Sequence, residues 1–285
     1  MTGKDGCIGA SIYVVADKNP PHAVYGVDFW GKPGCGTVFS VDETGAFDKV
    51  IQDFNYAPES SVHGTAFSPD SRFLYSADMH NNSIWTHPVD ENGIVGKPVD
   101  RTDGPVPHAE PRHISVHQTG KAAYIVTEVS NQVASYKVNS RTGIPHLQGP
   151  VYSLLPPDAD IKGYRGDEVM VSPSGKYLWA TTRSRDTSKP GYISVFDLDK
   201  NGAIVRQNFI LRTSSSGGVA NAVTPMDVSD RFVALTDSAD GFVQIWELAE
   251  GANSASVVAH ISLKDQGNDR YRSGCCANAL WLTSY

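Results

Sequence analysis

The segment HGTAFSPDSRFLYSAD, from His63 to Asp78, is the clearest indication of the fold, because it places a polar turn between two strand-like segments. Three further stretches align with it: RHISVHQTGKAAYIVTE from Arg112, DEVMVSPSGKYLWATTR from Asp167, and NAVTPMDVSDRFVALTD from Asn221. Successive starts are 49, 55 and 54 residues apart. A period near fifty residues built from strands predicts the blades of a β-propeller.

A second hairpin follows each of these pairs, so that every repeat supplies the four strands of one blade. The segments are NSIWTHPVDENG, NQVASYKVNSRTG, GYISVFDLDKNG and GFVQIWELAEG, and each ends in a turn that carries glycine. An aromatic residue recurs on the third strand, and we expect it to pack between blades: Trp85, Tyr136, Phe196 and Trp246.

We predict a single all-β propeller domain over 1–285. Whole blades are expected at about 63–93, 112–143, 167–202 and 221–251. Two incomplete copies flank them, a partial blade at 11–45 without its innermost strand and a terminal strand at 278–285. The total is about five blades, which predicts either a small ring or a chain truncated at its N-terminus, with open blade edges that allow a homo-oligomer.

Composition and charge argue against polyanionic partners. The chain has 31 acidic and 24 basic residues and a formal charge of −7, without a long run of either sign. We therefore expect no nucleic acid and no membrane partner, while a small anionic substrate remains compatible with a locally positive pocket. The four cysteines, at 7, 35, 275 and 276, contain no C-x-x-C spacing, so we expect reduced thiols in a cytoplasmic protein.

Two positions of the repeat predict a ring of ionisable side chains at one rim of the propeller channel. The residue just before the first strand of each blade is His63, Arg112, Asp167 or Asn221. The second strand runs antiparallel and is expected to end on the same rim at Lys18, Asp78, Glu128, Arg183 and Asp237. Since repeats normally agree at structural positions, this variety favours specialised roles.

A structural explanation competes with the functional one at each position. Asp78 and Asp237 are expected to accept backbone N–H bonds in the following turn. Taken alone, His63 is also explained as a buried histidine that is hydrogen-bonded to a loop. Arg112 is also explained as a partner of Glu110, and Glu128 as either structural or functional.

Other motifs carry little chemistry. The four-residue spacing of His113 and His117 does not create a paired face on a strand, SSSGG at 214–218 lacks the rest of a phosphate-binding loop, and no G-x-S-x-G occurs. The sequence predicts neither a metal site nor a cofactor.

The chain resembles the fungal 3-carboxy-cis,cis-muconate cyclases, within the lactonase-type seven-bladed propellers. The segments that carry the resemblance run from about residue 12 to the end: KNPPHAVY, GTVFSVDETG, VHGTAFSPDSRFLYSAD, SIWTHP, PRHISVHQTGKAAY, SGKYLWATTRS, SGGVANAVTP and NALW. The resemblance implies a metal-free cycloisomerase that closes a tricarboxylate diene to a γ-lactone in protocatechuate breakdown, the β-ketoadipate pathway. It also implies active-site positions at His63, Arg112, Glu128 and Arg183, with further matches at Lys18, Tyr164 and Arg165.

The chemistry of this reaction suits these residue types. Guanidinium groups hold carboxylates bidentately and stabilise charge as it develops, which we assign to Arg112 and Arg183. A proton donor is also needed, and His63 is the first choice, with Glu128 either orienting it or donating in its place. Asn221 is a further candidate from the repeat.

Two departures from the family pattern keep alternatives open. The family continues N-terminally for about one and a half more blades, and Val219 stands where the family has a histidine. One alternative is a non-catalytic propeller that binds a partner or metabolite. A second is a lactonase that hydrolyses a sugar-acid lactone, similar to the 6-phosphogluconolactonases.

Overall fold

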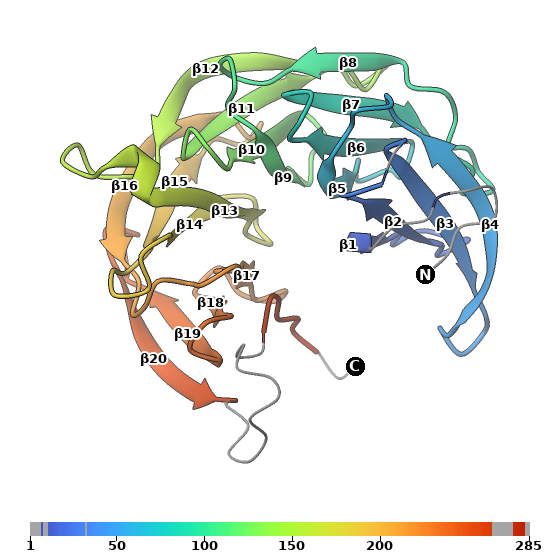
Figure 1. Ribbon diagram of the computed structural model, residues 1–285. Coiled ribbons are helices and arrows are strands. Elements are labelled where there is room, and N and C mark those ends of the chain that lie inside the picture. Colours follow the sequence, from blue (N-terminus) through green and yellow to red (C-terminus); the bar gives the residue numbers. More distant parts are fainter. Residues whose placement is uncertain (1–6, 8–10, 32, 264–275, 283–285) are drawn as a thin grey trace. The chain divides into compact units, whose positions relative to one another are not determined.

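A computed structural model describes residue 7 and residues 11–31, 33–263 and 276–282 (Figure 1). Within these residues the strands form five antiparallel sheets of four strands each, which confirms the predicted four-stranded blades. The described residues also form one short 3₁₀ turn, Ile161–Gly163, and contain no helix long and apolar enough to cross a membrane.

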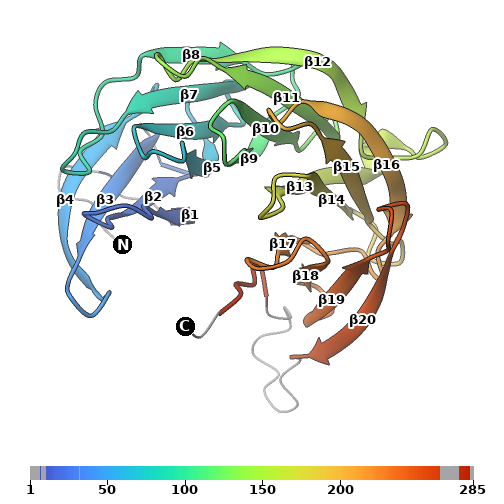
Figure 2. The same cartoon turned by 180° about the vertical axis from the view of Figure 1, so that it is seen from behind.

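The chain divides into two compact units, and each is described by itself. The first comprises residues 1–125 and 136–147, and the second comprises residues 126–135 and 148–285. The first unit contains the sheets β1-β2-β3-β4 and β5-β6-β7-β8, and the second contains β13-β14-β15-β16 and β17-β18-β19-β20 (Figure 2). The sheet of β9 to β12 has residues in both units. That the chain is a single domain stays a prediction.

The strands of the first two sheets are β1 (Ser11–Ala16), β2 (Val24–Asp28), β3 (Cys35–Val41), β4 (Phe47–Asn55), β5 (Val62–Phe67), β6 (Phe73–Asp78), β7 (Ser83–Pro88) and β8 (Asp100–Asp103). Those of the third are β9 (Pro111–Val116), β10 (Ala122–Thr127), β11 (Gln132–Val138) and β12 (Pro145–Ser153). Those of the last two are β13 (Tyr164–Val171), β14 (Tyr177–Ser184), β15 (Tyr192–Leu198), β16 (Ile204–Arg212), β17 (Val223–Pro225), β18 (Phe232–Asp237), β19 (Phe242–Leu248) and β20 (Ala255–Ser262).

Glycine fixes the turn between the third and fourth strands of each sheet. These turns need a left-handed backbone, which glycine adopts without a steric penalty. The five residues have φ between 73° and 88°: Gly45, Gly93, Gly143, Gly202 and Gly251. The four glycine turns expected from the repeat are therefore confirmed, and the first sheet adds a fifth at Gly45.

Each unit has its own hydrophobic core between neighbouring sheets. In the first unit, Tyr25 and Val27 of β2 pack with Leu74 of β6 and Trp85 of β7. In the second, the core contains Trp179, Val195, Leu235 and Trp246. The aromatic residues predicted on third strands do lie on the third strand of their sheets and are buried, namely Trp85, Tyr136, Phe196 and Trp246.

The N-terminal segment forms a complete sheet, so the expectation of a missing innermost strand was wrong. Residues 11–16 form β1, the first strand, and not the second one, and β2 pairs with it from Val24 to Asp28. Lys18 therefore lies in the turn between β1 and β2, whereas the second strand of this sheet ends at Asp28. The sequence placed the first sheet one strand out of step because the start of β1 does not match the other repeats.

The expected terminal strand at 278–285 does not appear in the part that the structure describes. Residues 278–282 are outside any strand, and residues 283–285 lie outside the described residues. Trp281 nevertheless docks on the second unit, because its indole Nε1 donates to the carbonyl oxygen of Thr224 at 3.0 Å.

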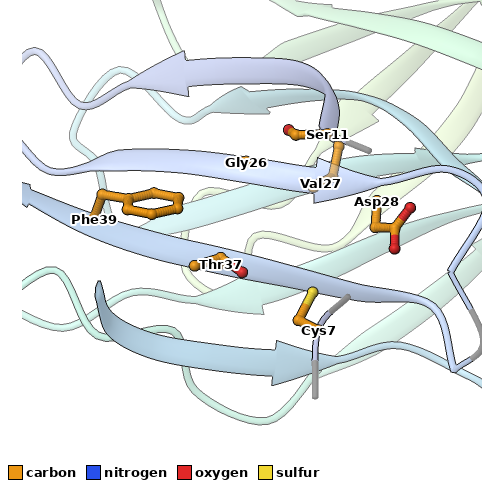
Figure 3. Close-up of a pocket in the computed structure, with 7 residues that line it drawn as sticks. All are labelled: Cys7, Ser11, Gly26, Val27, Asp28, Thr37 and Phe39. Atoms are coloured by element: carbon orange, nitrogen blue, oxygen red, sulfur yellow. The ribbon is translucent and has the colours of Figure 1, made fainter. Parts of the chain in front are cut away.

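The expectation of reduced thiols was wrong for three cysteines. Cys7 and Cys35 form a disulfide that ties the N-terminal segment to β3, and Cys276 is also disulfide-bonded, while Cys275 lies outside the described residues. Disulfides persist in oxidising compartments, so this bond gives no support to the predicted cytoplasmic location. Figure 3 shows Cys7, Ser11, Asp28 and Thr37 among the residues that line a small cavity on the first sheet.

Candidate functional site

A β-bulge positions His63 in the first unit. Val62 pairs with Asp78 and Gly64 with Ala77, so His63 is the extra residue of β5. Bulges turn a side chain away from its regular alternation and are common beside active sites. The His63 side chain is buried, and the ring of Phe29 packs against it edge-on with 5.2 Å between centroids.

His63 contacts a second buried histidine on the neighbouring strand. Its Nδ1 lies 3.0 Å from Nε2 of His113 on β9. On the other side of the His113 ring, Nη1 of Arg112 donates to Nδ1 at 3.4 Å. The predicted residues His63 and Arg112 thus belong to one hydrogen-bonded group, and His113 links them. In the sequence, His113 suggested only a metal ligand through its spacing from His117, although it directly follows Arg112 at the start of β9.

Gly64 makes this contact possible. A Cβ atom at this position would lie 2.7 Å from Cδ2 of His113 and 2.8 Å from the carbonyl oxygen of Arg112. Both distances are shorter than a carbon atom tolerates, so only glycine lets β5 approach β9 this closely.

In the second unit, Glu128 holds two arginines. Arg165 Nη1 donates to one carboxylate oxygen of Glu128, and Arg183 Nη2 donates to the other at 3.0 Å. Arg165 and Arg183 are direct cross-strand partners on β13 and β14, and Glu128 follows the end of β10. Like charges in this register repel, and the shared carboxylate compensates for the repulsion. Glu128 accepts from two guanidinium groups, and its expected role beside His63, as an orienting residue or a proton donor, stays a prediction.

Arg183 also contacts Asp167 and the backbone of Val219. Its Nε lies 3.2 Å from Oδ2 of Asp167, and its Nη1 donates to the carbonyl oxygen of Val219 at 2.5 Å. The two arginines and two carboxylates sum to no net charge. Val219 is 72% exposed, and its backbone carbonyl, not its side chain, contacts Arg183.

The second strands show why Glu128 and Arg183 are special. In three sheets the strand ends on a buried aspartate that accepts backbone N–H groups of the next turn, as expected for Asp78 and Asp237. Asp28 does the same toward Trp30 and Gly31. The other two sheets carry Glu128 and Arg183 at this position, and these two residues bond to each other.

The match to known families covers the larger part of the chain. A model of the lactonase family of seven-bladed β-propellers matches residues 22–218. The chain belongs to this lactonase family. The resemblance seen in the sequence is thereby confirmed, and the five sheets are blades of the propeller fold.

Individual lactonase-family relatives agree with this assignment. A carboxy-cis,cis-muconate cyclase of Neurospora crassa is 37% identical over 243 residues, which cover 83% of this chain and 66% of that protein. Muconate cycloisomerase 1 of Cutaneotrichosporon cutaneum is 30% identical over 190 residues, 64% of this chain and 50% of the relative. The chain thus spans half to two thirds of the length of these two proteins. A solved structure of a putative 6-phosphogluconolactonase from Bacteroides uniformis has a TM-score of 0.72 at 20% identity, covers 90% of this chain and 72% of its own, and shows the fold alone.

The remaining predicted residues of this lactonase-family chain have different surroundings. Tyr164 begins β13 and packs against Tyr192 with 5.3 Å between ring centroids, and burial and the hydrogen bond to Tyr192 raise the pKa of its phenol. The Asn221 side chain donates to the carbonyl oxygen of Thr182 at 2.9 Å, which ties the segment before β17 to β14. Lys18 is exposed at the opposite end of the first sheet from Asp28.

Two cavities of the first unit lie elsewhere. The cavity in Figure 3 holds about 20 Å³, which fits one water molecule. A second cavity, of about 110 Å³, is lined by turn residues such as Asp70, Thr119 and Ser140. It also includes Ser68, which follows the last residue of β5, whereas His63 lies near the first. The sequence prediction that His63, Arg112, Glu128 and Arg183 share one substrate site stays a prediction.

Proposed function

We propose that the protein is a cycloisomerase that closes 3-carboxy-cis,cis-muconate, or a closely related carboxylated diene, to a γ-lactone. The observation that carries this proposal is the arginine pair. Arg165 and Arg183 are fixed side by side by one carboxylate, and 35% of the Arg165 side chain is exposed. Two oriented guanidinium groups suit a substrate with several carboxylates.

The main requirement of the reaction is a positively charged group that stabilises the negative charge developing on the substrate. A substrate carboxylate adds to a carbon–carbon double bond that is conjugated with a second carboxyl group. A carbon–oxygen bond forms, the π bond breaks, and the electron pair moves toward that second carboxyl group. A fixed guanidinium group stabilises this charge without having to reorient, because Glu128 and Asp167 already hold Arg183 in place.

A proton must then reach the α-carbon. We assign its donation to His63, which takes a proton back from water after each turnover. The substrate is a trianion near neutral pH and the lactone is a dianion, so each turnover consumes one proton and involves no oxidant or reductant. Arg112, bonded to His113 beside His63, is the second carboxylate-binding candidate.

The relatives favour this reaction over the alternatives. The Neurospora protein at 37% identity is named as a carboxy-cis,cis-muconate cyclase, and a Formosa agariphila 6-phosphogluconolactonase is 27% identical over 58% of this chain. We infer a small anionic substrate as the partner, and the cytoplasmic location stays a prediction.

An ultraviolet assay tests the proposal. Purified protein is added to 3-carboxy-cis,cis-muconate, and we expect the diene absorbance to fall, with a slower fall for Arg183→Lys, whose point charge cannot replace the guanidinium fork. Hydrolysis of 6-phosphogluconolactone without an effect on the diene would assign the protein to the lactonases. Carboxylate binding by calorimetry, with neither compound consumed, would show a non-catalytic propeller.

A further inference from the structure

We propose that His113 is a positioning residue that determines which ring nitrogen of His63 carries the proton. The inference deepens the proposed function, because His63 is its proton donor. It depends on the chain of contacts Arg112–His113–His63 within the first unit.

The direction of the hydrogen bonds follows from the arginine. A guanidinium group donates and never accepts, so Nδ1 of His113 must be the unprotonated nitrogen of that ring. In the neutral imidazole the proton then sits on Nε2, which is the atom 3.0 Å from His63. His113 therefore donates to Nδ1 of His63, and neutral His63 carries its own proton on Nε2.

The surroundings of His113 keep its ring in this orientation. Tyr13 of β1 packs on it with 5.0 Å between ring centroids, and the absent side chain of Gly64 leaves room for its edge. His113 is itself buried, as are His63 and Arg112. The guanidinium of Arg112 and the phenol of Tyr13 are two ionisable groups in contact with the His113 ring. A buried ring held between a donor and an acceptor fixes a tautomer well, since the other tautomer would place two N–H groups against each other.

A matched pair of substitutions separates this role from packing. In His113→Gln the amide oxygen accepts from Arg112 and the amide nitrogen donates to His63, so the hydrogen-bond directions are retained. In His113→Phe the aromatic shape is retained and both bonds are lost. Thermal unfolding of both variants shows whether they are folded.

The ¹⁵N spectrum of labelled histidines, with His63 assigned by its absence in His63→Gln, gives the direct readout. We expect a pyridine-type Nδ1 and a pyrrole-type Nε2 for His63 in the wild type and in His113→Gln, and a mixture of tautomers in His113→Phe. With the muconate substrate, we expect kcat to fall about a hundredfold in His113→Phe and to recover at least partly in His113→Gln.

The spectrum decides the inference independently of the activity. A wild-type His63 with its proton on Nδ1, or a tautomer unchanged in a folded His113→Phe, would overturn the role of His113 even if the diene is consumed. If the wild type consumes no diene while His63 shows the expected tautomer and loses it in His113→Phe, the proposed reaction fails and the role of His113 stands.

Discussion

Arg165 and Arg183 lie directly opposite each other on β13 and β14, a register that places two positive charges on one face of the sheet. Glu128 resolves the conflict by binding one arginine with each carboxylate oxygen. Asp167 balances the second arginine, so the four side chains together carry no net charge.

The stability of this cluster depends on Glu128. The Glu128→Gln substitution retains the shape and removes the charge, which leaves two facing arginines without their shared anion. We expect the free energy of unfolding to fall by about 3 kcal/mol in urea denaturation. The cost of Arg165→Gln should be smaller in the Glu128→Gln background than in the wild type, and additive costs would show that the three groups are not coupled.

Arg165 is the test of carboxylate binding. Arg165→Gln should raise KM for the muconate about tenfold, because a charged hydrogen bond contributes about 1.5–3 kcal/mol. Arg206→Gln is the matched control, since Arg206 also pairs with a carboxylate, that of Asp197 at 2.7 Å, on the same sheet but at an exposed position. Equal kinetic effects of the two substitutions would remove Arg165 from the site.

His87 predicts a loss of stability in acid. It is buried on β7 against Tyr56 and Phe54, neither ring nitrogen has a hydrogen-bond partner in the described structure, and burial lowers its pKa from 6.5 to about 4. The unfolded chain binds a proton at a higher pH than the folded one. The stability contributed by neutral His87 is therefore complete above pH 6.5 and is lost as the pH falls toward 4.

Urea unfolding at two pH values measures this contribution. Between pH 7.5 and pH 5 we expect His87 to account for a loss of about 2 kcal/mol, and this part should vanish in His87→Phe. His146→Gln, at an exposed position of β12, should keep the wild-type pH dependence. If the free energy of unfolding of His87→Phe depends on pH as that of the wild type does, groups other than His87 cause the loss of stability in acid.

The disulfide between Cys7 and Cys35 should stabilise the first unit. It closes a loop with a sequence separation of 28 residues, for which the chain-entropy model gives about 3.6 kcal/mol. Cys7→Ser, Cys35→Ser and the double variant should lose the same amount in urea unfolding. A larger loss in the double variant than in either single variant would point to packing of the side chains instead of the bond.

The repeat in the sequence predicted the elements that depend on local pattern. Alternating apolar residues gave the strands, and Gly93, Gly143, Gly202 and Gly251 marked the turns because a left-handed backbone restricts the residue type. Glu128 and Arg183 were also recognisable in the repeat, because they replace the aspartate that binds the neighbouring turn in other sheets, as Asp78 and Asp237 do.

Contacts that depend on register and long-range pairing were not accessible in this way. The bulge at His63 and the close approach of the strands at Gly64 bring His113 into contact with His63. Neither feature can be predicted from the residue pattern of one strand. The pairing of Cys7 with Cys35 is a tertiary contact, and the start of β1 differs too much from the other repeats to be aligned.

Proton stoichiometry during turnover is the sharpest test of the proposed cyclisation. In a weakly buffered solution near pH 7.5, we expect one proton to be taken up from water for each diene lost, because a trianion becomes a lactone dianion. Release of a proton, as in lactone hydrolysis, or loss of the diene without any proton uptake, would contradict it.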